Sequence, residues 1–534
     1  MVALNFADLA LVNGKVLTMN KSEPCAEAIA VDGDRIVKVG TNDEIKMWIG
    51  ECTRVINLQG ATLIPGFIDT HIHVTDFSRY LKWVDLSDIT SIGDMHNRLR
   101  IRAQRAPKGK WIIGHGWNEA NFKKKRFPKL ADLDQASPDN PVVLYHQCGR
   151  LCIANSLALK LAEVTKETKA PQGGKIDKDA QTGELSGILR DNATDLIWKM
   201  VPEPSEEEIM NAVSLAFEKI VEAGITSIHW MVLSTIELRI IKKLLKNKLP
   251  LRIYIIIPIS LLKNWTHSEL SKDTCNTLVK VGGVEIIADG YLSAKKAALF
   301  QPYDDDPDNR GSLLCTQEKM NSLAKMVHDA NLQLIIRATG DKAIDLALTA
   351  IEETSKLAPA KTSRSRIEQA ALLNESLLQR MKQQNVIVSV QPRVVASEFA
   401  MWAAIRHLGS KRAKWLYPLR KMIREGIRVI GGSDCPMEPL NPLLGIKAAV
   451  TRDCFPQEKL TVDDALRIYT LNAAYSSNEE DIKGSIEEGK LADFAVLSRD
   501  LKAISPGEIE DVKVKMTIFE GRIVHPKSFS FNNC

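Results

Sequence analysis

Two histidines separated by one residue, His71 and His73, lie in the segment PGFIDTHIH, which begins at Pro65. In a β-strand alternate side chains share a face, so both imidazoles can point toward one place. The run before them, residues 61–68, is short, apolar and interrupted by proline and glycine, as expected of a buried strand that ends at a functional edge. Neutral imidazole is a common zinc ligand. The pair therefore indicates part of a metal site; the alternative is two histidines in a turn that bind nothing.

The composition is that of a large globular protein. The chain has 534 residues, of which 45% are hydrophobic and 26% charged, enough for a large core and for more than one average domain. The net charge of +5 is spread along the chain, and the one basic cluster, residues 123–126, is short. This pattern argues against a nucleic-acid partner and against a membrane-surface partner.

Cysteine usage and hydropathy bear on the cellular compartment. The nine cysteines are scattered and contain no CxxC pair, which favours free thiols in a reducing cytoplasm. The N-terminus lacks the pattern of a secretory leader. The most apolar stretch, residues 253–262, contains a proline and is too short to span a bilayer. We therefore expect a cytoplasmic protein.

The two ends of the chain share one pattern, which is short apolar runs separated by turns. Asp32-Gly33 and Glu520-Gly521 are turn signals between such runs. The candidate strands are residues 9–19, 26–31, 35–39, 53–58, 494–497, 512–519 and 522–524. We predict one small sheet domain built from both termini.

The middle of the chain alternates apolar β-type runs with helical stretches such as residues 205–223 and 320–331, which is typical of repeated βα units. Eight of these units predict an α/β fold, a (β/α)8 TIM barrel with its chemistry at the C-terminal strand ends. Residues 83–221, approximately, are too many for one βα loop, so we predict an insertion after strand 1 that covers the barrel mouth. The eight candidate strands are residues 63–68, 225–230, 251–257, 284–288, 332–338, 366–368, 386–391 and 428–432.

Asp434 follows the eighth candidate strand, in the sequence Gly432-Ser-Asp-Cys-Pro436. The first and last strands of a closed barrel are neighbours, so this carboxylate can approach His71 and His73. Two imidazoles and one carboxylate from opposite ends of the barrel sequence then converge, which strengthens the prediction of a metal site.

Motifs spread over almost the whole chain resemble the amidohydrolase superfamily, in particular its branch with N-substituted formamide deformylases. The resemblance implies a metal-dependent TIM barrel, residues 63–483, and a β-sandwich formed by residues 1–62 and 484–534. It also implies hydrolysis of non-peptide C–N bonds in small molecules. The motifs are LVNGKVLTMN, PGFIDTHIHV, Gly116-Trp117, Ala154-Asn-Ser156, Gly187-Ile-Leu-Arg190, Ala288-Asp-Gly290, Gly340-Asp-Lys-Ala343, Gly432-Ser-Asp-Cys-Pro436 and GSIEEGKLADFAVL.

The resemblance implies a two-ion centre, and the chain departs from it at the second ion. The first ion would be held by His71, His73 and Asp434, which are all present. The family's bridging lysine, carbamylated on strand four, is replaced by Glu285. The second ion's two histidines, after strands five and six, are replaced by Arg337 and Gln369, and a further histidine that faces the substrate is replaced by Arg150.

These replacements predict a mononuclear site. Arg337 has no lone pair for a metal and would repel one, and the neutral amide of Gln369 is a weak zinc ligand. Glu285 supplies a carboxylate where the family has the carbamate, so it either ligates the first ion or pairs with Arg337. We expect one divalent ion, Zn²⁺ first, with Mn²⁺ or Fe²⁺ as the other candidates.

Two function classes remain open. In a mononuclear hydrolase, Asp434 would pass a proton from water to the leaving amine, and Arg337 would stabilise the oxyanion or bind an anionic substrate group. The alternative is a catalytically impaired binding or regulatory protein on the same fold. The expected substrate is a small molecule, and an anionic one is among the candidates. A homo-oligomer is a further possibility that the sequence leaves open. The predicted substrate-binding residues are Trp117, Arg150, Lys295 and Gln369.

Overall fold

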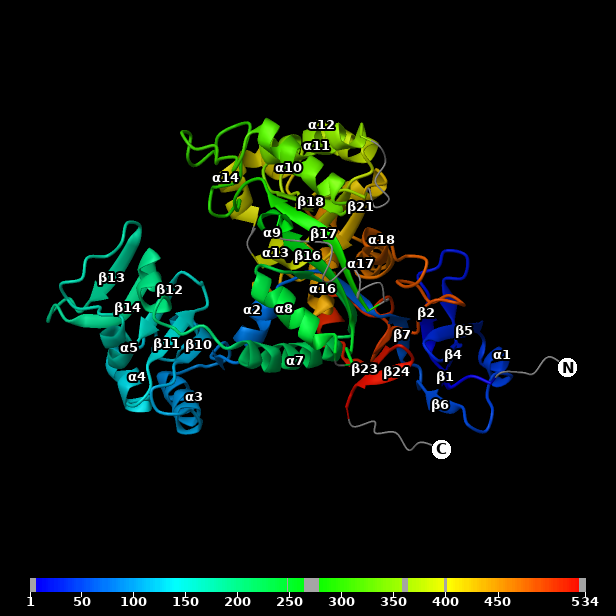
Figure 1. Cartoon of the computed structure of the whole chain (residues 1–534), viewed down its shortest axis with the longest axis horizontal. Helices are drawn as coiled ribbons and strands as arrows, with labels where there is room; N and C mark the ends of the chain where they lie inside the picture. The colour runs from blue at the N-terminus through cyan, green and yellow to red at the C-terminus, as the bar shows by residue number, and fades with distance from the viewer. Residues whose placement is uncertain (1–5, 247, 264–277, 358–363, 398–400, 528–534) are drawn as a thin grey trace. The chain divides into compact units, whose positions relative to one another are not determined.

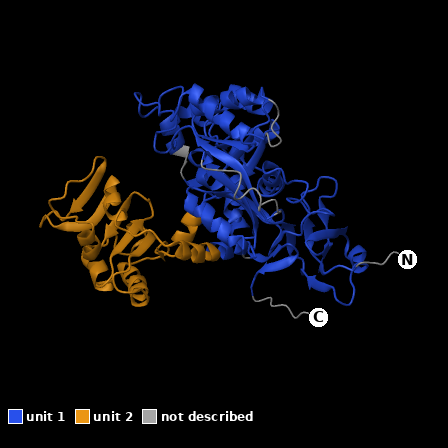
Figure 2. Ribbon diagram, in the orientation of Figure 1, with its two compact units in different colours: residues 1–74, 216–534 blue, residues 75–215 orange. Residues whose placement is uncertain are grey.

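The computed structural model describes residues 6–246, 248–263, 278–357, 364–397 and 401–527. It divides into two compact units (Figures 1 and 2). Unit 1 comprises residues 1–74 and 216–534, and unit 2 comprises residues 75–215. No helix among the described residues is both long enough and apolar enough to cross a membrane.

An eight-stranded parallel sheet forms the barrel of unit 1, with the hydrogen-bonded order β21-β20-β19-β18-β17-β16-β15-β8. Strands such as β16 and β20 are nearly continuous apolar runs, as expected when both faces of a parallel sheet are buried, whereas β8 and β19 carry the polar residues of the site. The fold class is therefore the one that the sequence predicts. The strands are β8 (Phe67–Ile72), β15 (Ile225–Met231), β16 (Arg252–Pro258), β17 (Val279–Ile287), β18 (Gln333–Ala338), β19 (Arg366–Gln369), β20 (Ile387–Val390) and β21 (Arg428–Gly431).

The barrel closes where its first and last strands meet. β8 and β21 stand at the two ends of the hydrogen-bonded order, and an isolated parallel bridge joins Ile72 to Cys435. The backbone here is close enough to require glycine, because a Cβ at Gly432 would lie 2.7 Å from the backbone nitrogen of His71. The closure therefore brings the ends of β8 and β21 together.

The predicted first barrel strand, residues 63–68, was wrong in its position. Gly66 divides this run: β7 (Thr62–Pro65) joins the sheet of the chain ends, and the barrel strand β8 starts at Phe67. At Gly66 a Cβ would come within 2.1 Å of the Thr226 hydroxyl, and the Gly66 amide donates to the Asp493 carbonyl. This apolar run thus contributes a strand to each of two sheets. His71 lies within the barrel strand β8 instead of after it.

Both chain ends form the predicted sheets. The four-stranded sheet has the order β5-β4-β1-β6, and the six-stranded sheet, β24-β23-β22-β7-β2-β3, contains strands from both ends. Apolar side chains such as Leu11, Leu63 and Phe494 share one buried core. The strands are β1 (Leu9–Val12), β2 (Lys15–Leu17), β3 (Cys25–Ala26), β4 (Ala28–Asp32), β5 (Arg35–Gly40), β6 (Arg54–Asn57), β22 (Phe494–Leu497), β23 (Val514–Phe519) and β24 (Arg522–His525).

Helices between the strands complete the βα units, and α7 and α10 match the predicted helices at 205–223 and 320–331 to within three residues. Helix α8, for example, buries Ile240, Ile241 and Leu244 on one face, as expected of a helix that covers a sheet. The helices, including α1 near the N-terminus, are α1 (Asn42–Lys46), α7 (Glu206–Glu222), α8 (Thr235–Leu244), α9 (Ile259–Leu262), α10 (Gln317–Asp329), α11 (Asp341–Ser355), α12 (Glu375–Gln383), α13 (Pro392–Ser397), α14 (Met401–Ala413), α15 (Leu419–Arg424), α16 (Pro442–Thr451), α17 (Val462–Ile468) and α18 (Leu471–Ser476).

Unit 2 is a mixed sheet with its own helices and its own apolar cores. Its strand order is β13-β14-β12-β11-β10-β9. The elements are α2 (Val74–Tyr80), β9 (Val84–Asp85), α3 (Ile92–Arg105), β10 (Ile112–Trp117), α4 (Leu130–Ala136), β11 (Val142–His146), β12 (Leu151–Ala154), α5 (Ser156–Leu161), β13 (Gly174–Lys178), β14 (Leu185–Asp191) and α6 (Asp195–Trp198).

Candidate metal centre

Two imidazoles and one carboxylate meet at the barrel closure. His71 and His73 come from the end of β8, and Asp434 from the segment after β21. The Asp434 Oδ1 atom lies 3.6 Å from His71 Nε2 and 3.3 Å from His73 Nε2. Nitrogen and oxygen atoms of all three residues lie within 4.8 Å of one another. The structure thus brings together the three residues that the sequence singled out, in an arrangement that one cation can bridge.

A buried carboxylate holds the two sides of this centre in place. Asp69 on β8 accepts hydrogen bonds from the Ser433 amide (2.9 Å), the Ser433 hydroxyl (2.5 Å) and the His71 amide (3.1 Å). Burial raises the pKa of Asp69 to about 6, although these hydrogen bonds oppose the rise. The Asp434 amide donates to the His71 carbonyl (2.8 Å). These contacts fix the position of Asp434 relative to β8.

The donor set and its charges fit a divalent cation. Two imidazole nitrogens with one carboxylate oxygen suit zinc, manganese or iron. Burial lowers the pKa of His71, but the nearby carboxylates of Glu368, Asp434 and Glu285 outweigh burial and raise it to about 9. Burial opposes ionisation of Asp434 too, yet the hydrogen bond with His73 and the neighbouring positive charges keep the pKa of Asp434 below its usual value. The same negative surroundings favour a bound cation.

Sequence reasoning missed the residue that orients His71. Glu368 on β19 has no exposed surface, and its Oε2 atom lies 3.1 Å from His71 Nδ1. When Nδ1–H donates to this carboxylate, the lone pair of Nε2 is directed at the candidate centre. Burial alone would raise the pKa of Glu368, but Arg366 and His71 lower it to about 2. Glu368 is therefore an ionised positioning residue for a metal-ligating histidine.

Glu368 is in turn held by a buried arginine. Arg366 forms an ion pair with Glu368 and donates to the Thr70 carbonyl (2.6 Å) and the Ser389 hydroxyl (3.0 Å). Its guanidinium also lies 3.0 Å from Nδ1 of His229, whose pKa is held well below its usual value by burial and by Arg366. The sequence could have indicated the pairing of Arg366 with Glu368, because residues two apart in the strand Arg-Ile-Glu share a face.

Replacing Glu368 with glutamine should weaken metal binding by about 10- to 100-fold, because the neutral amide no longer enforces the tautomer and basicity of His71. Competition with a chelator of known zinc affinity measures this directly, without any assay of turnover. Glu237→Gln is the matched control, since Glu237 is buried on α8 and accepts a hydrogen bond from Trp230. Equal zinc affinities for Glu368→Gln and the control would contradict the positioning role.

The sequence predicts that Glu285 either ligates the first ion or pairs with Arg337. Among the described residues, the group of three within 4.8 Å does not include Glu285 and no ion pair joins Glu285 to Arg337, although Glu285 is buried close enough to His71, His73 and Arg337 for their charges to affect its pKa. The strand register explains this, because Glu285 lies opposite Ile335 while Arg337 lies opposite Ile287, one side-chain layer further along. Burial raises the pKa of Glu285, and its Oε1 atom has no hydrogen-bond partner among the described residues.

The contact that the structure shows for Arg337 is with an aromatic ring. Its guanidinium carbon lies 4.3 Å from the centre of the Tyr291 ring, and one of its nitrogens is buried without a hydrogen-bond partner in the described part of the chain. Its charge contributes to the low pKa of Asp434. Arg337 therefore supplies positive charge near the centre.

The predicted substrate-binding residues of unit 1 are engaged internally. Lys295 was predicted to bind a substrate anion, and its ammonium lies 3.0 Å from Asp305. Gln369, at the end of β19, is buried and accepts a hydrogen bond from the Thr339 hydroxyl (2.9 Å). Both side chains thus have an intramolecular partner.

The other two predicted substrate-binding residues belong to unit 2. Trp117 on β10 is completely buried, and its Nε1 donates to the Leu144 carbonyl (3.1 Å). Its prediction as a pocket residue is corrected, because this side chain packs inside an apolar core of unit 2. Arg150 is exposed and pairs with Asp191 at 2.7 Å.

Three comparisons identify the family of proteins that shares this barrel, these sheets of the chain ends and the His-His-Asp centre. A model described as the amidohydrolase family matches residues 54–525. YtcJ of Bacillus subtilis is 33% identical over 531 residues, covering 96% of this chain and 99% of YtcJ. N-substituted formamide deformylase of Arthrobacter pascens is 26% identical, covering 98% and 99%.

A solved structure, described as an uncharacterized metal-dependent hydrolase from Pyrococcus furiosus, superimposes with a TM-score of 0.75 at 26% identity. The match covers 92% of this chain and 99% of that one. This chain belongs to the amidohydrolase family.

Proposed function

We propose that the protein is a metal-dependent hydrolase of a non-peptide C–N bond in a small molecule, with one divalent ion per chain. The observation that carries this proposal is the convergence of His71, His73 and Asp434 within 4.8 Å at the barrel closure. The family membership supports it, as does the relative named for deformylation of N-substituted formamides. An amide, a formamide or a cyclic amide is the expected substrate class.

The residues around the centre have distinct roles in this proposal. His71, His73 and Asp434 would hold the ion, which supplies Lewis acidity and lowers the pKa of bound water to about 7. Asp434 is ionised at neutral pH because its pKa is lowered, so it can accept a proton from the attacking water and deliver it to the leaving nitrogen. Arg337 adds positive charge for an oxyanion or for an anionic substrate group.

The metal content should be about one ion per chain, because the resemblance places Arg337 and Gln369 where the second ion's histidines would be. Elemental analysis of purified protein, loaded with zinc and then desalted, measures the ratio. His71→Ala should lose the ion, while His96→Ala, a substitution on helix α3, should retain it. Two ions per chain, or an unchanged content in His71→Ala, would contradict the single three-ligand site.

A second candidate function is a binding or regulatory protein, and the arginine and the amide in place of two histidines favour it. A panel of N-formyl amines, N-acyl amines, cyclic amides and amidines, tested with zinc, manganese or iron, separates the two functions. Turnover that requires metal supports the hydrolase. Saturable binding of a panel member without any hydrolysis would support the alternative.

A further inference from the structure

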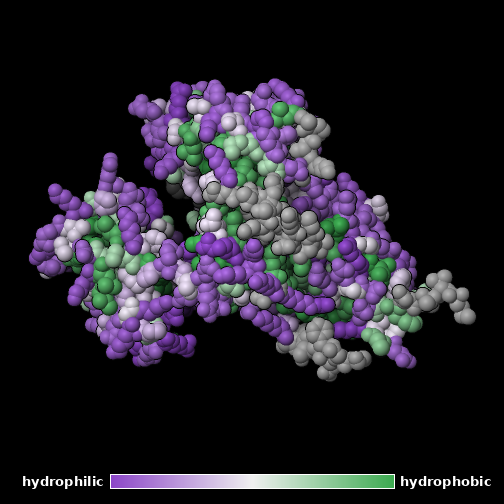
Figure 3. Space-filling model, in the orientation of Figure 1, coloured by the Kyte–Doolittle hydropathy of each residue, from purple (hydrophilic) through white to green (hydrophobic). Residues whose placement is uncertain are grey.

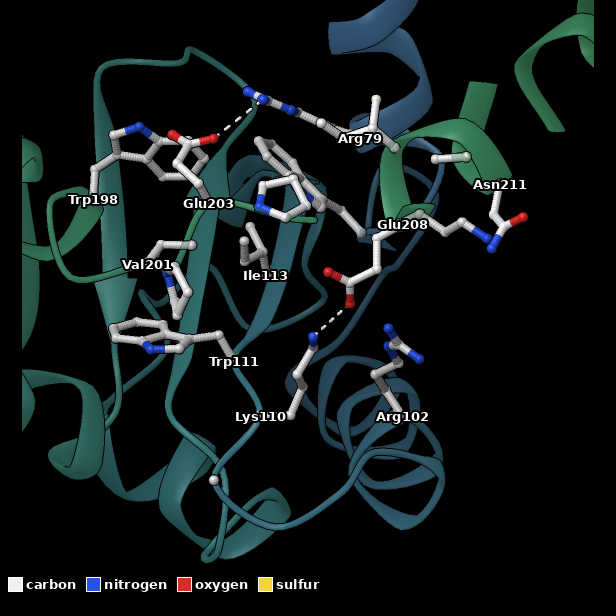
Figure 4. A pocket seen from close by; sticks show the side chains of 17 residues that line it. Arg79, Arg102, Lys110, Trp111, Ile113, Trp198, Val201, Glu203, Glu208 and Asn211 are labelled. Atoms are coloured by element: carbon white, nitrogen blue, oxygen red, sulfur yellow. Dashed lines mark hydrogen bonds and ion pairs between the residues drawn. The ribbon is translucent and has the colours of Figure 1, made fainter. Parts of the chain in front are cut away.

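Unit 2 contains a cavity of about 470 Å³ that the proposed chemistry does not use (Figure 4). This volume lies within the range of about 300–1,000 Å³ that is usual for small-molecule sites. All of its lining residues belong to unit 2, and they come from α2 and the segment after it, α3, the segment that enters β10, the end of α6 with the segment after it, and the first turns of α7. The cavity is therefore formed by five separate parts of one compact unit.

Aromatic side chains make the apolar part of this cavity. Trp83, Trp111 and Trp198 line it. Trp198 keeps 38% of its surface exposed, and its ring centre lies 5.9 Å from that of Trp83. On the face shown in Figure 3, unit 2 presents hydrophobic side chains among mostly hydrophilic ones. Flat tryptophan surfaces that remain accessible are suited to contact with a planar ring.

Two ion pairs lie in the walls of the cavity. Arg79 lies 3.2 Å from Glu203, and Lys110 lies 2.8 Å from Glu208 (Figure 4). These ion pairs connect α2 to the segment after α6, and the start of β10 to α7. They also neutralise the two carboxylates that line the cavity, so neither carboxylate is left to repel an anion.

Two further lining residues leave an excess of positive charge. Lys82 and Arg102 both line the cavity and are exposed, and neither side chain forms an ion pair or hydrogen bond with another residue in the described part of the chain. In Figure 4 Arg102 lies across the cavity from Trp111 and Trp198. A guanidinium binds a carboxylate or sulfonate through two parallel hydrogen bonds. The cavity thus offers an apolar aromatic side and a cationic side.

We propose that this cavity binds an aromatic organic acid, with its ring against Trp111 and Trp198 and its anionic group at Arg102. The mostly apolar lining does not suit a small inorganic anion, which needs polar partners on all sides. A neutral aromatic molecule would leave the two cations unused. The site is independent of the metal centre, so its test does not depend on hydrolysis.

A matched pair of dyes tests the proposal on the full chain. 8-Anilino-1-naphthalenesulfonate carries the aromatic rings and an anionic group, and N-phenyl-1-naphthylamine has the same rings without the charge. Fluorescence titration should give one saturable site for the sulfonate, with affinity about tenfold or more above that for the neutral dye, as expected for one charge-assisted contact. Arg102→Ala should remove this preference, and Trp198→Ala should weaken both dyes.

Arg100→Ala is the matched control, because Arg100 is an exposed arginine on the same helix and does not line the cavity. Arg102→Lys should restore part of the preference for the sulfonate, which a loss of folding would not do. Equal affinities for the two dyes, or equal effects of Arg102→Ala and Arg100→Ala, would show nonspecific adsorption and overturn the proposal. Failure of the sulfonate to bind would overturn it as well.

Discussion

Asp434→Asn should reduce hydrolysis by about 10²- to 10⁴-fold and leave the fold intact, because the amide cannot accept the proton that the proposed reaction must transfer. The side chain keeps its size, and the backbone contact between the Asp434 amide and the His71 carbonyl does not involve the carboxylate. Turnover should be measured with the substrate identified by the panel, at saturating metal.

Metal content and thermal unfolding must be measured on the same preparation of this variant. They separate a lost proton transfer from a lost ion or an unfolded chain. Asp481→Asn, a substitution of an exposed residue, is the matched control and should keep full activity. Retained turnover in Asp434→Asn would remove the proton-transfer role, whatever its metal content.

Arg366→Met should destabilise the barrel by about 3–5 kcal/mol, because it removes the main charge partner of the buried Glu368 carboxylate and leaves His71 to compensate it. Neither side chain has exposed surface, so water cannot replace the guanidinium. Unfolding in urea, monitored by a signal from unit 1, measures the loss. Adding Glu368→Leu to Arg366→Met should recover part of the stability, because the uncompensated charge is then gone.

The control for this experiment is an ion pair on the surface of the protein. Lys325→Met removes the same type of charge from the pair between Lys325 and Asp329, whose side chains are both more than half exposed. The expected cost there is at most about 1 kcal/mol. A similar small cost for Arg366→Met, or no recovery in the double variant, would show that the buried pair does not matter for stability.

The barrel and its main candidate centre could be predicted because both follow from rules that a single sequence displays. Apolar runs alternating with helices gave the eight strands, and the neighbouring position of first and last strands in a closed barrel placed Asp434 near His71. The one misplaced strand, residues 63–68, depended on Gly66. Nothing in the apolar run shows that the chain passes from one sheet to another at that residue.

The details of the site that the sequence could not predict depend on how two elements pack together. Strand register separates Glu285 from Arg337, and register cannot be read from either strand alone. Tertiary packing turns Trp117 into a core residue of unit 2. Arg366 and Glu368 appeared only as the short predicted strand 366–368, and their partners, His71 and His229, lie more than a hundred residues away.

The contact between β8 and the segment after β21 affects the stability of the closed barrel. One bridge, the Asp69–Ser433 contacts and the three converging side chains join these strands. An ion held across that contact would fasten the first strand to the segment after the last. A ligand that binds only the native state stabilises it in proportion to the logarithm of the ligand concentration. The free energy of unfolding of the barrel would therefore rise with the concentration of available metal. The same three side chains would then contribute both to hydrolysis and to barrel stability.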